Sequence, residues 1–241
     1  FQYFEKFKNI VVAVDEKRKN GIEQLLLQKQ KLEVILLDDA YQHRKVKAGF
    51  YILLTSYGDL FSDDFMLPTG NLRESRAGAK RANIVVVTKC PNFLSREEQE
   101  LICGKLKLAK SQELFFTTIA YDDCVFSEKE QLKVIDLVGR EKLLLAGIAK
   151  PQPFFAYLQA ENDITMVYPD HHYFTEKDIL EIKNKAQNRI IITTEKDYVR
   201  LKGSVLGEQL FYLPIKSTFI NAEENFKKTI LNYVGTSSRN S

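Results

Sequence analysis

Short apolar runs recur along the chain and alternate with longer polar stretches. Most of the runs are continuous rather than alternating in polarity, which is typical of strands buried on both faces of a parallel sheet. The pattern predicts strands at Ile10–Val14, Val34–Leu37, Tyr51–Thr55, Ile84–Thr88, Leu114–Ile119, Leu143–Ile148, Thr165–Tyr168, Ile190–Thr194 and Leu210–Leu213.

Helix signals lie between many of these runs. A Ser or Thr followed three residues later by an acid is a capping box, and this spacing occurs at Ser95–Glu98, Ser127–Glu130 and Thr175–Asp178. The first box predicts a helix that runs to about Ala109. Alternating strands and helices predict an α/β fold with a doubly wound, mostly parallel sheet.

A change in composition near the middle of the chain predicts two domains. The segment Thr117–Lys142 is polar and acidic, and no long apolar run follows Ile119 within it. We therefore expect a boundary near Gly139, with a larger domain at residues 1–139 and a smaller α/β domain at residues 140–241 that ends in a helix.

Composition narrows the class of protein. The 241 residues are 44% hydrophobic and 28% charged, which is ordinary for a globular protein with a sizeable core. A net charge of +3 argues against a dedicated nucleic-acid binder. Cys90, Cys103 and Cys124 are scattered and odd in number, so we expect reduced thiols. No apolar run approaches the roughly 18 residues that span a bilayer.

The stretch "VILLDDAYQHRKVK" contains the first candidate site. An apolar strand that ends in Asp38 and Asp39 would place carboxylates at the carboxyl edge of a sheet, where they could hold Mg²⁺ against phosphate oxygens. The alternative is a pair of acids that caps a turn. The basic residues that follow could contact phosphates or form a solvated loop: His43, Arg44, Lys45 and Lys47.

Three further polar clusters follow predicted strands or turns. In "MLPTGNLRES", Arg73 and Glu74 follow a turn, and they are either site residues or the surface of a short helix. In "YPDHHYF", the pair Asp170–His171 could shuttle a proton or could form a surface turn. In "TTEKDYVRL", the segment Thr194–Asp197 could simply cap the next helix. The glycine-rich P-loop GxxxxGK[ST] does not occur in the 241 residues.

Five segments in this order resemble the tetraacyldisaccharide 4'-kinases, the lipid A 4'-kinases of Gram-negative bacteria. The segments are "LLDDAYQHR", "MLPTGNLRES", "AGIAKPQPFF", "YPDHHYF" and "TTEKDYVRL". The resemblance implies a P-loop NTPase-like kinase of two α/β domains. Such an enzyme uses ATP and Mg²⁺ to phosphorylate the 4'-hydroxyl of tetraacyldisaccharide 1-phosphate, giving lipid IVA in lipopolysaccharide biosynthesis.

The resemblance also implies roles for individual residues. Asp38 and Asp39 match the paired acids of the family's Walker-B-like strand and would bind the metal. Gln42, His43, Arg44 and Arg73 would contact substrate, and Glu74 would lie close to the metal. His171, next to Asp170, would support a catalytic aspartate, whereas His172 is a weaker candidate. Glu195, Lys196 and Asp197 match a family element to which we assign no role.

The family further implies a peripheral enzyme on the cytoplasmic face of the bacterial inner membrane. Its partners would be the lipid A disaccharide 1-phosphate precursor and the membrane surface, and not nucleic acid. Because the P-loop is missing and the chain begins at Phe1, we expect a piece of a longer protein with little activity of its own. The alternatives are a non-catalytic module that binds an anionic lipid or a protein, and a kinase for another small hydroxyl substrate.

Overall fold

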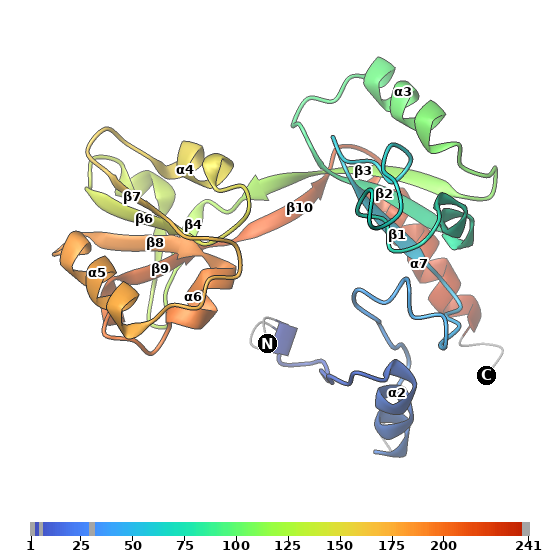
Figure 1. Cartoon of the computed structure of the whole chain (residues 1–241), viewed down its shortest axis with the longest axis horizontal. Helices are drawn as coiled ribbons and strands as arrows, with labels where there is room; N and C mark the ends of the chain where they lie inside the picture. Colours follow the sequence, from blue (N-terminus) through green and yellow to red (C-terminus); the bar gives the residue numbers. More distant parts are fainter. Residues whose placement is uncertain (1–2, 5–6, 29–31, 238–241) are drawn as a thin grey trace. The chain divides into compact units, whose positions relative to one another are not determined.

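The computed structural model describes residues 3–4, 7–28 and 32–237 and divides them between two compact units (Figure 1). The four-stranded unit comprises residues 9–119 and 217–241, and the six-stranded unit comprises residues 1–8 and 120–216. This division differs from the expected boundary near Gly139. Residues 120–139 belong with the second sheet, and the C-terminal helix belongs with the first.

The four-stranded unit is built on a sheet of order β1-β2-β3-β10, in which β1, β2 and β3 are parallel. Helices α3 and α7 lie on opposite faces of this sheet (Figure 1). Its elements are α2 (Arg18–Leu27), β1 (Ile52–Ser56), η1 (Arg76–Arg81), β2 (Ile84–Cys90), α3 (Arg96–Leu106), β3 (Glu113–Tyr121), β10 (Ile215–Phe219) and α7 (Glu223–Ser237).

The alternation of β2 side chains explains why both faces of this sheet are covered. Val85 and Val87 pack with Ile102 of α3, whereas Ile84 and Val86 pack with Phe226 of α7. Successive side chains of a strand point to opposite faces, so a continuous apolar run needs a helix on each side. The continuous runs therefore predicted the layering correctly.

The six-stranded unit has the sheet order β5-β4-β9-β8-β6-β7. Strands β7, β6, β8 and β9 are parallel, whereas β4 pairs antiparallel with β9 and β5. Its elements are β4 (Cys124–Phe126), β5 (Gln131–Lys133), η2 (Val134–Leu137), β6 (Lys142–Ala146), α4 (Gln152–Leu158), β7 (Ile164–Val167), α5 (Glu176–Ala186), β8 (Ile190–Thr194), α6 (Glu195–Leu201), η3 (Gly207–Gln209) and β9 (Leu210–Leu213).

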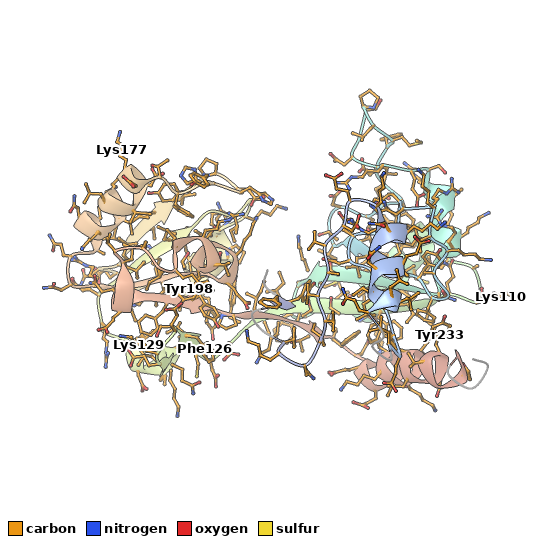
Figure 2. All side chains as sticks on the ribbon, turned by 90° about the horizontal axis from the view of Figure 1, so that it is seen from below. Lys110, Phe126, Lys129, Lys177, Tyr198 and Tyr233 are labelled. Atoms are coloured by element: carbon orange, nitrogen blue, oxygen red, sulfur yellow. The ribbon has the colours of Figure 1, made fainter. Side chains whose placement is uncertain are left out.

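This sheet is also covered on both faces. Leu143 and Leu145 of β6 pack with α5 and α6, and Leu144 packs with Phe154 of α4. A row of aromatic side chains continues the core toward β4, because Tyr212 lies 5.8 Å from Phe126 and 4.7 Å from Tyr198, centroid to centroid (Figure 2). The doubly wound, mostly parallel α/β fold is confirmed for both units.

Two predicted strands are wrong. Residues 10–14 and 34–37 form no strand in the structure, and Val14 and Leu36 are 93% and 89% exposed. An apolar run becomes a strand only beside a neighbour that pairs with its backbone, and the described part of the chain offers these runs none. The acids Asp38 and Asp39 therefore follow an irregular segment rather than a strand.

One predicted helix is also wrong. The capping box at Ser127–Glu130 lies instead in the tight turn of the β4–β5 hairpin. Ser127 donates its backbone N–H to the Glu130 carbonyl at 2.9 Å, and its hydroxyl accepts from the Lys129 and Glu130 amides. A serine side chain stabilises such a turn as readily as it caps a helix. The boxes at Ser95 and Thr175 are confirmed and open α3 and α5.

Candidate functional site

The first cluster of predicted site residues lies in the four-stranded unit. Asp38 and Asp39 are exposed in a turn, and Asp39 has a left-handed φ of 44°. Its carboxylate lies 3.7 Å from Arg73 Nη1, so the structure brings together two motifs that are far apart in the sequence. Both side chains are mostly exposed, which makes this a weak ion pair. The two carboxylates remain accessible to a cation.

A second set of contacts fixes the loop that follows these acids. Arg81 donates to Glu74 Oε1 at 2.7 Å and to the Tyr41 carbonyl at 3.1 Å, and its guanidinium lies 4.7 Å from the centre of the Tyr41 ring. Tyr41 in turn donates its hydroxyl to the Gly78 carbonyl at 2.9 Å. The Glu74 carboxylate raises the pKa of Arg81. The loop is therefore anchored to the segment that carries Glu74.

Close packing around Glu74 limits where its carboxylate can point. A Cβ added at Gly78 would lie 2.6 Å from Glu74 Oε1, so a larger residue there would displace the Glu74 carboxylate. Glu74 is half-buried and directed at Arg81. The expected position of Glu74 beside a metal held by Asp38 and Asp39 remains a prediction.

A surface pocket of about 420 Å³ lies beside this loop, and it is lined by Tyr41, His43, Arg44, Val46, Lys47, Tyr51 and Arg81. Within the described residues, His43, Arg44 and Lys47 form no ion pair. A concave surface with cationic side chains of this kind favours an anionic ligand. His43 and Arg44 were predicted from the sequence, whereas Gln42 does not line the pocket.

The second cluster lies in the six-stranded unit, at the carboxyl end of its parallel strands. Asp170 follows β7, and its Oδ1 accepts from Lys196 Nζ at 2.7 Å and from the His171 amide at 2.9 Å. The Lys196 ammonium holds the pKa of Asp170 below its usual value. The structure thus connects the Asp-His pair directly to the Thr-Glu-Lys-Asp segment.

The two adjacent histidines have different surroundings. His171 has a left-handed φ of 61° and a side chain that is 73% exposed, with Nε2 3.8 Å from Asp170 Oδ2. His172 Nε2 lies 3.0 Å from Asp178 Oδ2, and its ring stacks on Tyr168. His172 is packed into the fold, and His171 is the one that faces outward. The preference for His171 over His172 as a catalytic residue stays a prediction.

One further group of possible metal ligands lies close together in the structure: Asp122, Asp123 and Cys124. Among the described residues no group of three ligands forms around Asp38 and Asp39. Lys216 Nζ lies 2.8 Å from Asp122 Oδ2 and lowers the pKa of that carboxyl. The lysine already pairs with one carboxylate of this group, and we assign no site to it.

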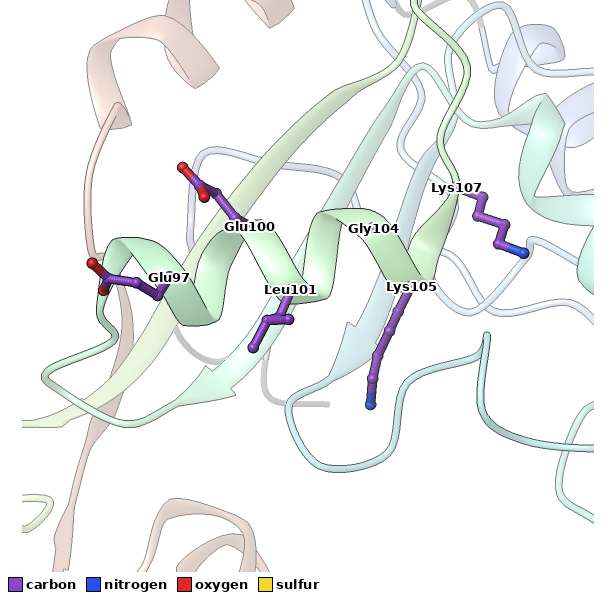
Figure 3. Close-up of a pocket in the computed structure, with 6 residues that line it drawn as sticks. All are labelled: Glu97, Glu100, Leu101, Gly104, Lys105 and Lys107. Atoms are coloured by element: carbon purple, nitrogen blue, oxygen red, sulfur yellow. The ribbon is translucent and has the colours of Figure 1, made fainter.

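The outer face of α3 carries a shallow hollow of about 710 Å³ (Figure 3). Leu101 and Lys105 project from one side of the helix and Glu100 from the other, so the hollow is an exposed helix surface rather than an enclosed site. No predicted site residue lies there.

Several residues of the two clusters were not predicted from the sequence. Tyr41, Tyr51 and Arg81 line the pocket, and Arg200 contacts the Asp-His loop. Lys47 also lines the pocket, and it was among the basic residues predicted to contact phosphate. The signal for Tyr41 was its place next to the basic loop. Nothing in the local pattern distinguishes Arg81 or Arg200 from a surface arginine, because Arg81 contacts Tyr41 40 positions away and Arg200 contacts the His172 carbonyl 28 positions away along the chain.

Comparison with known proteins gives one consistent result. A family model described as tetraacyldisaccharide-1-P 4'-kinase matches residues 3–235. A tetraacyldisaccharide 4'-kinase of Flavobacterium johnsoniae is 63% identical over 97% of this chain and 69% of its own length. Those of Flavobacterium psychrophilum and Bacteroides thetaiotaomicron are 60% and 39% identical over all of this chain, and over 71% and 70% of theirs.

A solved structure shares the fold. It is a crystal structure of LpxK from Aquifex aeolicus in complex with ATP, with a TM-score of 0.66 and 27% sequence identity. The match covers 92% of this chain and 64% of the crystallised one. The chain therefore spans somewhat under two thirds of that protein.

No helix among the described residues combines the length and apolarity that crossing a bilayer would need.

Proposed function

The chain belongs to the tetraacyldisaccharide-1-P 4'-kinase family, and from this we propose that it acts in an ATP-dependent transfer of phosphate to the 4'-hydroxyl of tetraacyldisaccharide 1-phosphate. The family match over residues 3–235 carries the proposal. The product would be lipid IVA, an intermediate of lipid A biosynthesis. Relatives that bear the kinase name do not favour a non-catalytic module.

The first part of the proposal concerns the metal. Asp38 and Asp39 would hold Mg²⁺, since their carboxylates are exposed and adjacent and oxygen is the ligand that Mg²⁺ prefers. When bound, the ion would offset the negative charge of the transferred phosphate. Arg73, 3.7 Å from Asp39, would hold this carboxylate in place and contact substrate.

The second part concerns the anionic groups of the substrates. His43 and Arg44 line the cationic pocket, and Gln42 lies next to them in the chain. We propose that these residues bind a phosphate group by charge and hydrogen bonds. Glu74 accepts a hydrogen bond from Arg81 and would hold that side chain in the wall of the pocket. We also propose that Glu74 lies near the metal.

The third part concerns the proton of the 4'-hydroxyl. Phosphoryl transfer requires mainly positioning and charge stabilisation, together with a group that accepts the proton of the attacking hydroxyl. His171 is exposed and has a carboxylate beside it, as a group that supports such a base would need. Asp170 would orient the His171 turn through its contact with the His171 amide.

The substrate carries acyl chains, so the enzyme must meet it at a membrane surface. We propose peripheral attachment on the cytoplasmic face of the inner membrane, where ATP is available. The support for this part is the chemistry of the substrate in the relatives' name, together with the cationic pocket.

The test uses the protein expressed from its complete gene. It is assayed with ATP, Mg²⁺ and tetraacyldisaccharide 1-phosphate, beside the double variant Asp38→Asn with Asp39→Asn and the control Asp136→Asn, an exposed acid outside both clusters. We expect turnover in the wild type, a loss of at least about 100-fold in the double variant because the metal's charge stabilisation is lost, and wild-type rates in the control. No turnover from the folded wild type would reject the substrate, and full activity of the double variant would reject the metal role.

A further inference from the structure

Three loops meet at one edge of the six-stranded sheet. Strands β8, β6 and β7 are neighbours and run parallel, so their carboxyl ends lie side by side. Gly147 follows β6, Asp170 follows β7, and Glu195 opens α6 directly after β8. This edge is the usual place for a functional site in an open α/β sheet.

A buried carboxylate ties two of these loops together. Asp197 is fully buried, and its Oδ2 accepts from the Gly147 amide at 2.8 Å and from the Thr194 hydroxyl at 2.7 Å. A Cβ added at Gly147 would lie 3.0 Å from Asp197 Oδ1 and 3.5 Å from the Pro169 carbonyl. The start of α6 is therefore tied to the loop that follows β6, and a side chain at position 147 would crowd this contact.

Two basic side chains extend from α6 to the loop that holds the histidines. Lys196 Nζ lies 2.7 Å from Asp170 Oδ1, and Arg200 Nη1 donates to the His172 carbonyl at 3.5 Å. Arg200 also lies 3.5 Å from the buried carboxylate of Asp197. The helix thus contacts the loop on both sides of His171.

The far side of the loop is held by α5. His172 Nε2 lies 3.0 Å from Asp178 Oδ2, at the first turn of that helix. His171 therefore lies between two residues that are each fixed by other elements, while its own side chain is 73% exposed. Its left-handed φ of 61° is an unfavourable conformation for histidine, which neighbouring contacts must maintain.

We propose that the segment from Thr194 to Arg200 is a positioning element for His171, with Lys196 as its main contact and Asp197 as its anchor. The inference rests on the proposed function, in which His171 supports the base. Lys196 is a positioning residue because it acts on His171 only through Asp170. Capping of α6 by Thr194 does not explain why Lys196 and Arg200 contact the loop that holds the histidines, whereas a positioning role does.

The first test compares three single variants. Lys196→Met keeps the length of the side chain and removes its charge, Lys196→Arg restores the charge, and Lys177→Met on α5 is a matched control whose exposed lysine points into solvent (Figure 2). We expect Lys196→Met to lower kcat by about 10- to 100-fold with a KM within twofold of wild type, because misplacing a catalytic group has an effect of this size. Lys196→Arg should recover most of the rate.

The second test asks whether the effect passes through His171. In a background of His171→Ala, the change Lys196→Met should alter kcat by less than about twofold, since contacting residues that act as a unit are not additive. A full 10-fold loss in that background would overturn the proposal, as would a Lys196→Met enzyme with wild-type kcat.

A third readout does not depend on activity. Amide exchange in residues 170–174 should become faster in Lys196→Met and in Asp170→Asn, and exchange in β6 and β8 should not change. If the wild type fails to phosphorylate the disaccharide while this exchange pattern appears, the proposed function is wrong and the positioning role stands. Unchanged exchange in both variants would reject the positioning role whatever the activity.

Discussion

A single buried ion pair shows how much one side chain contributes to the six-stranded unit. The side chains of Lys142 and Asp163 are 3% and 1% exposed, and Lys142 Nζ lies 2.9 Å from Asp163 Oδ2. The carboxylate also accepts the amides of Lys142 and Ala160, both at 2.8 Å, and the ammonium donates to the Arg140 carbonyl. Both charged groups of the pair therefore have hydrogen-bond partners inside the protein beyond each other.

Removing the lysine should therefore be costly. Lys142→Met leaves a buried carboxylate whose charge no ammonium compensates, and we expect a loss of about 3–5 kcal/mol in the free energy of unfolding. Urea unfolding followed by circular dichroism measures it. The exposed Lys177→Met should change the same quantity by less than about 0.5 kcal/mol. A loss below about 1 kcal/mol in Lys142→Met would show that the backbone donors alone compensate Asp163.

The helix α5 links a local sequence signal to pH dependence. Thr175 caps the helix and Asp178 completes the capping box, accepting from the Thr175 amide at 2.8 Å and from its hydroxyl at 2.7 Å. These bonds, with that of His172, lower the pKa of Asp178 to about 2. The folded protein therefore binds the proton at this site more weakly than the unfolded chain does.

Because the pKa of Asp178 is lower in the folded protein than in the unfolded chain, ionisation of Asp178 stabilises the fold. A depressed carboxyl pKa contributes stability above the unfolded value near 3.8, and the contribution is lost as the pH falls toward 2. We expect Asp178→Asn to lower Tm at neutral pH, and the difference from wild type to shrink between about pH 4 and pH 2. Thermal unfolding followed by circular dichroism across this range measures it. A constant difference at all pH values would show that the charge of Asp178 is irrelevant.

The elements also show what could be predicted from the sequence. The strands β8 and β9 and the caps of α3 and α5 were predicted closely, because a continuous apolar run and a capping box are local signals. The runs at 10–14 and 34–37 carry the same signal but form no strand, since pairing is a property of neighbours. The strands β4 and β5 were missed because each has only 3 residues, and β10 was missed because polar residues interrupt its apolar ones.

The candidate sites were predictable to a similar extent. The adjacent acids, the basic loop and the Asp-His pair were found because each is a local cluster. Contacts such as Lys196 with Asp170 join residues 26 positions apart, and only the fold brings them together. The same holds for Arg81, whose partner Tyr41 is 40 positions away.

At the level of the whole chain, each unit has a hydrophobic core of its own. Leu144 belongs to a cluster within residues 120–216, and Ile84 belongs to one that includes Phe226 and Ile230 of α7. Among the described residues, no buried cluster draws its members from both units. The α/β class was predictable because it depends on local periodicity. The grouping of α7 with the first sheet was not, because it depends on contacts such as that of Phe226 with the cluster of Ile84, which lies far away along the chain.

Separate cores should unfold separately. Both Leu144→Ala and Ile84→Ala remove a fully buried side chain from a central strand, at a cost of about 2–5 kcal/mol each. We expect calorimetry to resolve two unfolding transitions. Leu144→Ala should lower the transition temperature of the six-stranded unit and Ile84→Ala that of the four-stranded unit, because each cavity weakens only the core that contains it. A single transition that both variants shift equally would show that the two units unfold as one cooperative structure.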